Sequence, residues 1–440
     1  MDFVNHTPFP ALAFAGIDPH GQSFHVVVLR QTLTWDATGA LTFTDVQAPL
    51  CEVDEYVGAC NTSAVRQESD LCHYKPHCDL LVVADAYAPE GTPTPRWLVR
   101  IALRQPGAPS AALIHKTLCV TGARRFVRRV APLRWAARLL GWLTFGQVRP
   151  SPWRLEEPQP ALRVSVRDDL AFGGDCRIDA GDPAAARVAA RDRLTPEQRA
   201  AHPDAALPPP RQPVAHAAWE VNPIGRGFAT PWYLKATGVN SVPAPQIEDP
   251  ECPITARHFA DLLDGRLAAA EAARLSVGLG VRAKGHPERR RLAGTLDAAF
   301  AASPAWLPAD FDFAVWNAAP PDQQCGFLNG DEVIELVNLC QPQTPGATCD
   351  RQGHTWLRLT LPGNLPFILT RFESGTLGEV ATNLDTLLID VEARQVTCVW
   401  RATLGSAPPV RRLEARLLRP AQLAALRADA AASGFPPDGR

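Results

Sequence analysis

SFHVVVL, residues 23–29, is a β-branched run that follows the turn signal DPHG at residues 18–21. Valine is stiff at χ1 and packs well on a pleated surface, so this run predicts a strand, which continues through QTLTWD at residues 31–36. The turn DATG at residues 36–39 then leads into the alternating run LTFT at residues 41–44. Two strand-like runs joined by a glycine-containing turn predict a β-hairpin.

Strand-like runs recur near both ends of the chain, and a proline-rich middle separates them. The runs cover residues 79–85, 96–104, 114–120, 332–339, 354–361, 367–372 and 411–418, with a second hairpin of 384–392 and 395–403. The middle contains runs such as AALPPPRQP at residues 205–213, and helix-like runs at 182–202 and 255–275 interrupt it. A short helix is predicted at residues 420–432, because proline starts it and glycine follows it.

These patterns predict a mainly β fold of the sandwich or meander type, with a proline-rich and partly helical middle, and hence an α+β protein overall. We expect an N-terminal β-rich region at 1–150, a proline-rich irregular region with short helices at 151–325, and a C-terminal β-rich region ending in a helix at 326–440. The two β-rich regions can also form one continuous body. The 42 prolines among 440 residues disfavour a helical bundle, because proline lacks an amide donor and clashes inside a helix.

Charge and hydropathy narrow the classes of function. The 44 Lys and Arg nearly balance the 46 Asp and Glu, so the net charge of −2 gives no argument for binding nucleic acid. The 11 Cys are scattered without a disulfide spacing, which favours reduced thiols in a cytoplasmic protein. No membrane span and no secretion signal are expected, because apolar runs of about 18 residues and a basic leader are both missing. The Arg-rich run at 124–138 is expected to be a solvated edge, with contact to a membrane surface or an acidic partner as the alternative.

The segment CHYKPHC, residues 72–78, gathers four residues of metal-ligand type, namely Cys72, His73, His77 and Cys78. Structural zinc sites usually take two ligands from a tight C-x2–4-C turn, and the spacing here is wider and contains a proline. No second pair follows at zinc-ribbon distance. We therefore expect no metal and no other cofactor, and a metal-supported binding module stays the alternative.

Catalytic motifs are missing from the sequence. It contains no G-x-S-x-G nucleophile elbow, no H-E-x-x-H zinc motif and no phosphate-binding G-x-x-x-x-G-K loop. The carboxylates at Asp168-Asp169, Asp310, Asp312 and Asp322 could do acid–base work, but Asp more often serves turns and caps. We expect no catalytic residue and no enzymatic activity. A hydrolase of polysaccharide that uses Asp310, Asp312 or Asp322 is the alternative.

One loop in the middle of the chain is the candidate for contact with a partner. It places Trp316 and Asn317 shortly before Pro320, Asp322 and Gln323. An aromatic anchor in a polar loop is typical of interface hot spots. The same residues can instead hold the loop's own structure, which is the commoner role of such residues. The sequence leaves both interpretations open.

Several runs, taken in their order along the chain, are too particular to reflect composition. They are NHTPF at 5–9, VVV at 26–28, DL at 70–71, KP at 75–76 with DLLV at 79–82, KTL at 116–118, AFGG at 171–174, NP at 222–223 with Gly225 and Gly227, DFD at 310–312, NGDEV at 329–333, LDTL at 384–387 and VWR at 399–401. Their order, over about residues 5–403, resembles a bacterial family of unknown function that is encoded beside type VI secretion genes.

The resemblance implies an accessory adaptor or chaperone. Such a protein would bind a cognate toxin effector, a PAAR-type tip protein or a spike protein in the cytoplasm, and would help to load the effector onto the secretion spike. The resemblance implies no catalytic residue and no cofactor, so the partner it predicts is another protein.

Overall fold

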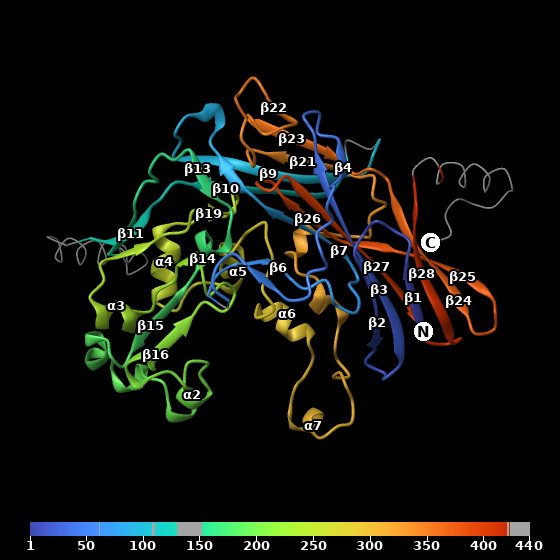
Figure 1. The fold of residues 1–440 in the computed structure, drawn as a ribbon. Helices are drawn as coiled ribbons and strands as arrows, with labels where there is room; N and C mark the ends of the chain where they lie inside the picture. Colours follow the sequence, from blue (N-terminus) through green and yellow to red (C-terminus); the bar gives the residue numbers. More distant parts are fainter. Residues whose placement is uncertain (61, 108–110, 130–151, 420–421, 423–440) are drawn as a thin grey trace.

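The computed structural model describes residues 1–60, 62–107, 111–129, 152–419 and 422. Strands dominate these residues and join into several sheets, with a few short helices between them (Figure 1). The predicted mainly β, α+β fold class is therefore confirmed. The predicted helix at 420–432 and most of the Arg-rich run at 124–138 lie outside the described residues.

A seven-stranded sheet joins the two ends of the chain. Its order is β2-β3-β27-β26-β7-β20, with β4 paired to β3. The bounds are β2 Ala11–Ile17, β3 Ser23–Trp35, β4 Leu41–Phe43, β7 Cys78–Val83, β20 Gln324–Cys325, β26 Asn383–Asp390 and β27 Gln395–Gly405. β3 runs antiparallel to β27 from Phe24 opposite Gly405 to Thr34 opposite Gln395. The SFHVVVL run thus becomes an inner strand that holds the first third of the chain against its last quarter.

Both predicted hairpins are confirmed, since β3 pairs antiparallel with β4 and β26 with β27. In the first turn, the Asp36 carboxylate accepts hydrogen bonds from the backbone N–H groups of Thr38 at 2.8 Å and Ala40 at 3.1 Å. Gly39 has a φ of +81°, and a Cβ there would lie 2.6 Å from the carbonyl oxygen of Arg358. A side chain does not fit at this turn, which explains the glycine of the DATG signal.

Two further sheets complete the β body. The six-stranded sheet has the order β19-β10-β9-β21-β23-β22, and the four-stranded sheet has the order β1-β28-β24-β25, with β1 parallel to β28. The bounds are β19 Ile247–Glu248, β10 Ala112–Thr121, β9 Arg96–Arg104, β21 Val333–Val337, β23 Thr355–Thr360, β22 Ala347–Cys349, β1 Asp2–Asn5, β28 Val410–Leu418, β24 Leu365–Phe372 and β25 Leu377–Ala381. Leu29, Leu103 and Leu413, one from each large sheet, belong to a single hydrophobic cluster.

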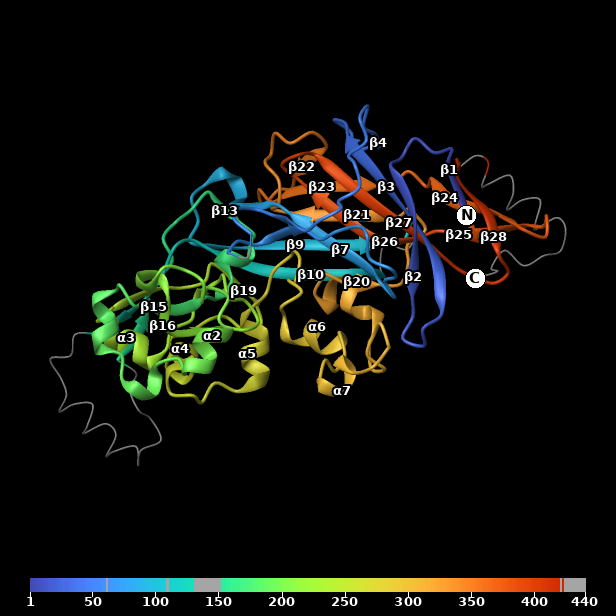
Figure 2. The ribbon, with the colours of Figure 1, turned by 60° about the horizontal axis from the view of Figure 1, so that its bottom comes forward.

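The proline-rich middle folds around a second, smaller cluster. Phe126 stacks on Phe259 with ring centroids 4.3 Å apart, and Trp153 meets Phe259 edge-on at 5.0 Å. The helices of the middle lie together on one side of the large sheets (Figure 2). Their bounds are α2 Pro196–Ala201, α3 Pro231–Thr237, α4 Ala256–Leu263, α5 Ala269–Leu275, α6 Pro287–Leu292 and α7 Ala298–Ala301. None of the helices in the described ranges is long and apolar enough to cross a membrane.

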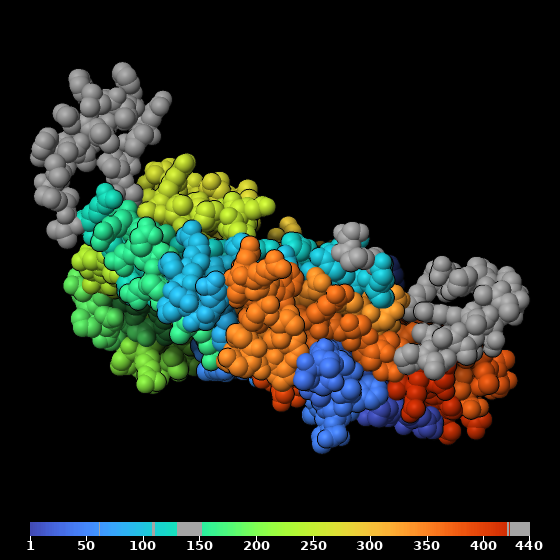
Figure 3. Space-filling view, turned by 90° about the horizontal axis from the view of Figure 1, so that it is seen from above, coloured from blue at the N-terminus to red at the C-terminus, as the bar shows by residue number. Residues whose placement is uncertain are grey.

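Short strands pair locally around these helices. They are β5 Glu55–Tyr56 with β6 Val65–Gln67, β8 Asp85–Tyr87 with β13 Arg163–Ser165, β11 Arg125–Arg128 between β12 Trp153–Leu155 and β18 Ser241–Pro243, β14 Phe172–Gly173 with β17 Arg226–Gly227, and β15 Asp175–Asp179 with β16 Pro213–Ala218. Seen from above, the middle of the chain forms one end of an elongated molecule, and the two chain ends form the other (Figure 3). The division at residues 150 and 325 stays a prediction, although the strands on either side of it share the same sheets.

The two long helices predicted in the middle are wrong in extent. Residues 182–202 form 3-10 turns at Pro183–Arg187 and Ala190–Asp192 before α2, and residues 255–275 divide into α4 and α5. Gly265, with a φ of +68°, lies between α4 and α5 and ends the helical run. The predicted cap of α2 is confirmed, because Thr195 Oγ1 accepts from the backbone N–H of Gln198 at 3.2 Å and the Gln198 side chain accepts from the backbone N–H of Thr195.

Candidate functional site

The predicted partner loop is held to the β body by its own amide side chains. Asn317 is buried, and its Nδ2 donates to the carbonyl oxygen of His77 at 2.8 Å and to Asp79 Oδ1 at 3.0 Å. Gln323 is fully buried, and its Nε2 donates to the carbonyl oxygens of Leu80 at 2.7 Å and Leu279 at 3.0 Å. These two buried residues therefore hold the loop against the β body and are not accessible to a partner in solution.

Two of the remaining loop residues border a cleft of about 660 Å³. Pro320 and Asp322 line it, and the Asp322 side chain is largely exposed. Trp316 lies outside the lining residues; it packs edge-on against His73, with ring centroids 6.4 Å apart. A cleft of this size falls in the range of small-molecule and side-chain pockets.

Distant segments of the chain form the walls of this cleft. The lining residues come from 54–68, 221–224, 273–286 and 320–322, together with Lys116, Asp168, Ala171 and Asp249. Figure 1 shows β6, α5 and α6 beside one another around this place. The cleft therefore lies where the helical middle meets the β body.

A buried lysine forms the floor of the cleft. Lys116 projects from β10 with its side chain only 7% exposed, and its Nζ donates to Asp322 Oδ1 at 3.0 Å and to Gln323 Oε1 at 2.8 Å. Burial lowers the pKa of the Lys116 ammonium, and the Asp322 carboxylate partly offsets this shift. The lysine of the KTL run thus binds the last two residues of the PDQ turn at residues 321–323 and holds the turn against the sheet.

Ion pairs close the rim of the cleft. Lys284 Nζ contacts the Asp54 carboxylate at 2.7 Å, and the buried Arg289 donates to Glu68 Oε1 at 2.6 Å. Arg282 donates to Glu288 at 2.7 Å, next to His286. Burial and the nearby Arg282 charge lower the pKa of His286 to about 4, so this imidazole is neutral at pH 7. The α6 segment is therefore tied to the 54–68 segment by charge.

Asp168 also lines the cleft, and it differs from the charged groups above, each of which has an ion-pair partner. No described residue donates a hydrogen bond to its carboxylate, whose Oδ1 packs 2.7 Å from the place where a Cβ at Gly278 would lie. Burial and the neighbouring Asp169 raise the pKa of Asp168 to about 6, although Lys116 opposes the shift. The group can hold or release a proton near neutral pH, and its ionised form suits a cationic group in the cleft.

Asp168→Asn is expected to raise stability at neutral pH. The folded chain binds the Asp168 proton more tightly than the unfolded chain, so stability falls as the pH rises from about 4 to about 6. Asparagine cannot ionise, and the variant should gain about 1–3 kcal/mol over the wild type at pH 7.5 and much less at pH 4. Urea unfolding at both pH values measures the difference. A gain of equal size at pH 4 and pH 7.5 contradicts the assignment.

The carboxylates of the hydrolase alternative serve local structure. Asp310 accepts from the backbone N–H of Thr295 at 2.9 Å and from its hydroxyl at 2.7 Å. Asp312 caps the 3-10 turn Phe313–Trp316 by accepting from the N–H of Ala314 at 2.8 Å. Asp322 pairs with Lys116, as described above. Each of these three carboxylates thus has its own partner among the described residues.

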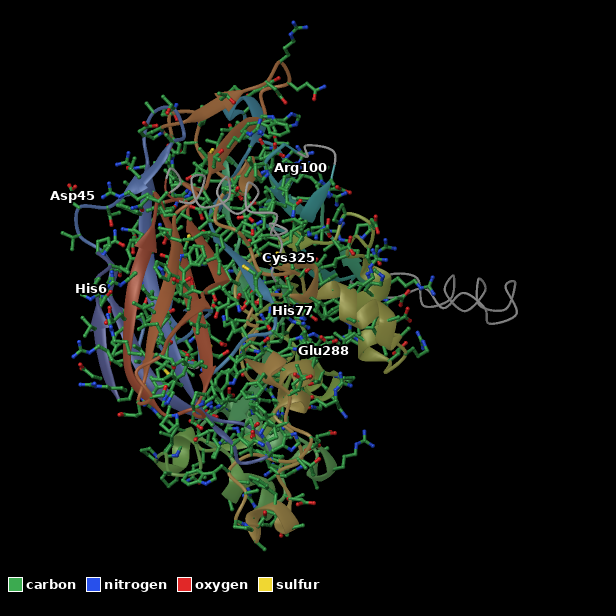
Figure 4. All side chains as sticks on the ribbon, turned by 90° about the vertical axis from the view of Figure 1, so that its right-hand side faces the viewer. His6, Asp45, His77, Arg100, Glu288 and Cys325 are labelled. Atoms are coloured by element: carbon green, nitrogen blue, oxygen red, sulfur yellow. The ribbon has the colours of Figure 1, made fainter. Side chains whose placement is uncertain are left out.

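The Cys and His residues of the metal alternative also have separate surroundings. Cys72 and Cys78 are buried thiols whose pKa is raised by burial, and Cys78 lies opposite Cys325 in the pair of β7 and β20. His73 packs against Phe14, Phe24 and Trp316. His77, labelled in Figure 4, is exposed. Across the described ranges, no group of three or more His, Cys, Asp and Glu is placed to hold a metal ion.

Motif residues that are far apart in sequence meet in a buried polar network formed by strands of the seven-stranded sheet and the segment before β7. Its ion pairs are Lys75 with Asp79 at 2.9 Å, Arg401 with Asp385 at 2.6 Å, and Arg30 with Asp70 at 2.8 Å. Lys75 Nζ also donates to Thr386 Oγ1 at 2.8 Å. The runs that carry the family resemblance thus have a structural role, because they join the first third of the chain to its last quarter.

Two surface features escape the sequence analysis. The strand β2 has the sequence ALAFAGI, without a charged residue, although it lies at the edge of a sheet. The loop after α6 carries Trp306, which is 79% exposed. The sequence does mark the segment that contains Trp306, because no Lys or Arg occurs between Arg291 and Arg351 in a chain otherwise rich in arginine.

The structure thus defines a mainly β protein with a helical middle, in which paired strands and buried hydrogen bonds, such as Lys75 to Thr386 and Arg401 to the carbonyl oxygen of Cys72, join the two chain ends. The chain belongs to the family described as "Uncharacterized protein conserved in bacteria (DUF2169)", whose model matches residues 20–401. This confirms membership in a bacterial family of unknown function. The family description says nothing of type VI secretion or of an adaptor role. No curated protein and no solved structure matches the chain.

Proposed function

We propose that the chain is a type VI secretion adaptor or chaperone that binds a cognate toxin effector, or a PAAR-type tip protein, in the cytoplasm and helps to load it onto the spike. The proposal rests on the ordered motifs of the sequence and assigns no catalytic step and no cofactor. Release needs no energy source, because competition from the assembling spike can shift the binding equilibrium.

The exposed edge of β2 is the observation that carries a protein-binding role. β2 pairs with β3 on one side, and no strand among the described residues pairs with its other side. Its seven residues are all uncharged, and Leu12 is 40% exposed. Edge strands usually carry charges, prolines or bulges that prevent pairing with another chain. An uncharged edge of this length suits the addition of a partner strand.

Charges on this edge are expected to break the complex with the effector. Leu12→Lys with Ala15→Lys should weaken binding to the effector encoded beside this gene by about tenfold or more, since lysines on an edge oppose strand pairing. Leu377→Lys, at a 59% exposed position on β25, which is the edge strand of a different sheet, is the matched control. Affinity is measured by titration of the purified, co-expressed proteins.

Deletion of the gene tests the role itself. We expect the neighbouring effector to lose both its stability in the cytoplasm and its secretion, and expression of the wild-type chain should restore them. Unchanged effector level and secretion in the deletion strain would sink the proposed function.

A further inference from the structure

The segment after α6 forms an arm that projects from the body. Residues 294–312 leave and return at nearly the same point, and Figure 1 shows the arm with α7 at its end, below the other elements. The backbone N–H of Asp312 donates to the carbonyl oxygen of Leu292 at 2.9 Å, and the Asp310 carboxylate binds Thr295. These contacts close the arm at its base.

The base of the arm is rigid. Phe313 packs edge-on against Phe311, Tyr74 and Phe24, with ring centroids 5.2, 5.7 and 6.3 Å apart. Phe24 belongs to β3, so this aromatic contact anchors the arm to the large sheet. Gly294 has a φ of +82°, and a Cβ there would lie 2.7 Å from the Cβ of Pro308. Only glycine therefore fits at this position of the closed base.

The arm exposes large apolar side chains instead of burying them. Trp306 is 79% exposed and Leu296 is 69% exposed, the highest values among the large aromatic and leucine side chains that the structure describes as exposed. α7 is a single turn capped by Asp297, which accepts from the N–H of Phe300 at 2.8 Å. A tryptophan offers a large rigid contact area at low entropy cost, which is why it is enriched in the centres of interfaces.

The charged side chains of the arm are all acidic. Asp297, Asp310 and Asp312 are exposed, and the arm contains no Lys or Arg. Hydrogen bonds from Thr295 lower the pKa of Asp310, so this carboxylate stays ionised at neutral pH. An apolar anchor surrounded by carboxylates is complementary to an apolar pocket with a basic rim.

We propose that the arm is the docking element for the cognate effector, and that Trp306 enters an apolar pocket rimmed by Lys or Arg on that protein. This inference rests on the proposed function and names the partner's surface chemistry. The arm and the β2 edge lie on the same side of the molecule in Figures 1 and 2, so a partner that adds a strand to β2 can also reach the arm.

The test uses the full chain co-expressed with the effector encoded beside its gene. A benzophenone amino acid in place of Trp306 should cross-link to the effector on irradiation, whereas the same group in place of Leu377 should not. Trp306→Ala should weaken binding about 30-fold or more, which is the usual effect of removing an interface tryptophan. Asp297→Asn keeps a cap-forming side chain, and it should reduce the loss of affinity that added salt causes.

The outcomes separate this inference from the proposed function. If the effector binds Trp306→Ala as tightly as the wild type and the cross-link at 306 is missing, the arm is not the docking element, although the adaptor role stands. If only a second copy of this chain cross-links at 306, the arm serves self-association and the inference is wrong. If the wild-type chain does not bind the effector at all, both proposals fall together.

Discussion

Asp79→Ala is expected to remove about 3–5 kcal/mol of stability, among the largest losses that a single polar substitution in this chain should cause. The Asp79 carboxylate is fully buried and accepts hydrogen bonds from Lys75 Nζ at 2.9 Å, Asn317 Nδ2 at 3.0 Å and the backbone N–H of Ala318 at 2.8 Å. Burial lowers the pKa of the Lys75 ammonium, but the neighbouring Asp79 carboxylate raises it by more, so the net shift is upward. The backbone N–H of Ala319 also donates to this carboxylate, at 3.3 Å, so without Asp79 a buried cation and three amide donors lose an acceptor.

Chemical denaturation of the purified chain measures this loss. Since domains are stable by about 5–15 kcal/mol, the variant should unfold at much lower denaturant concentration or fail to fold. Asp45→Ala is the matched control, because Asp45 is exposed and lies at the outer edge of the molecule in Figure 4. The control should change stability by less than about 0.5 kcal/mol. If both variants unfold alike, Asp79 has no special role in holding the loop.

The strands of this fold were predictable because their signals are local. The run 23–29 and the hairpin 384–403 carry β-branched and alternating residues that need no partner to be read as strands. Their pairing was not predictable, since β3 lies beside β27 across more than 360 residues of sequence. The helix at 255–275 was predicted too long because its apolar spacing continues past Gly265, and only the glycine's positive φ divides it.

The candidate loop shows what sequence could and could not say about the site. The aromatic residue in a polar loop drew attention to residues 316–323. It did not predict that Asn317 and Gln323 face the interior while Asp322 faces the cleft. The sequence offered Asp168-Asp169 as paired carboxylates, but only the folded structure shows that burial, together with Asp169, raises the pKa of Asp168. Trp306 belongs to no motif, and its importance comes from exposure that composition alone does not report.

The pair of Arg401 and Asp385 is expected to show a large coupling between β27 and β26, two neighbouring strands of the seven-stranded sheet. Asp385 lies at a β-bulge, where the register of β26 against β27 shifts between Leu384 and Thr386. A bulge re-aims a side chain, and here the carboxylate reaches Arg401 Nε at 2.6 Å, while Arg401 Nη1 donates to the carbonyl oxygen of Cys72 at 2.7 Å. The guanidinium therefore binds a strand of the last quarter to the segment that precedes β7.

Arg401→Met should cost about 3–5 kcal/mol, because it leaves the Asp385 carboxylate buried without a cation. Asp385→Leu alone should cost a similar amount for the opposite reason. The double variant should lose less than the sum of the two by about 2 kcal/mol or more, since two apolar side chains can pack where a buried ion pair stood. Urea unfolding of the four proteins measures the coupling. If the two losses simply add, the ion pair does not act as a unit, and Arg401 stabilises the fold chiefly through its hydrogen bond to the carbonyl oxygen of Cys72.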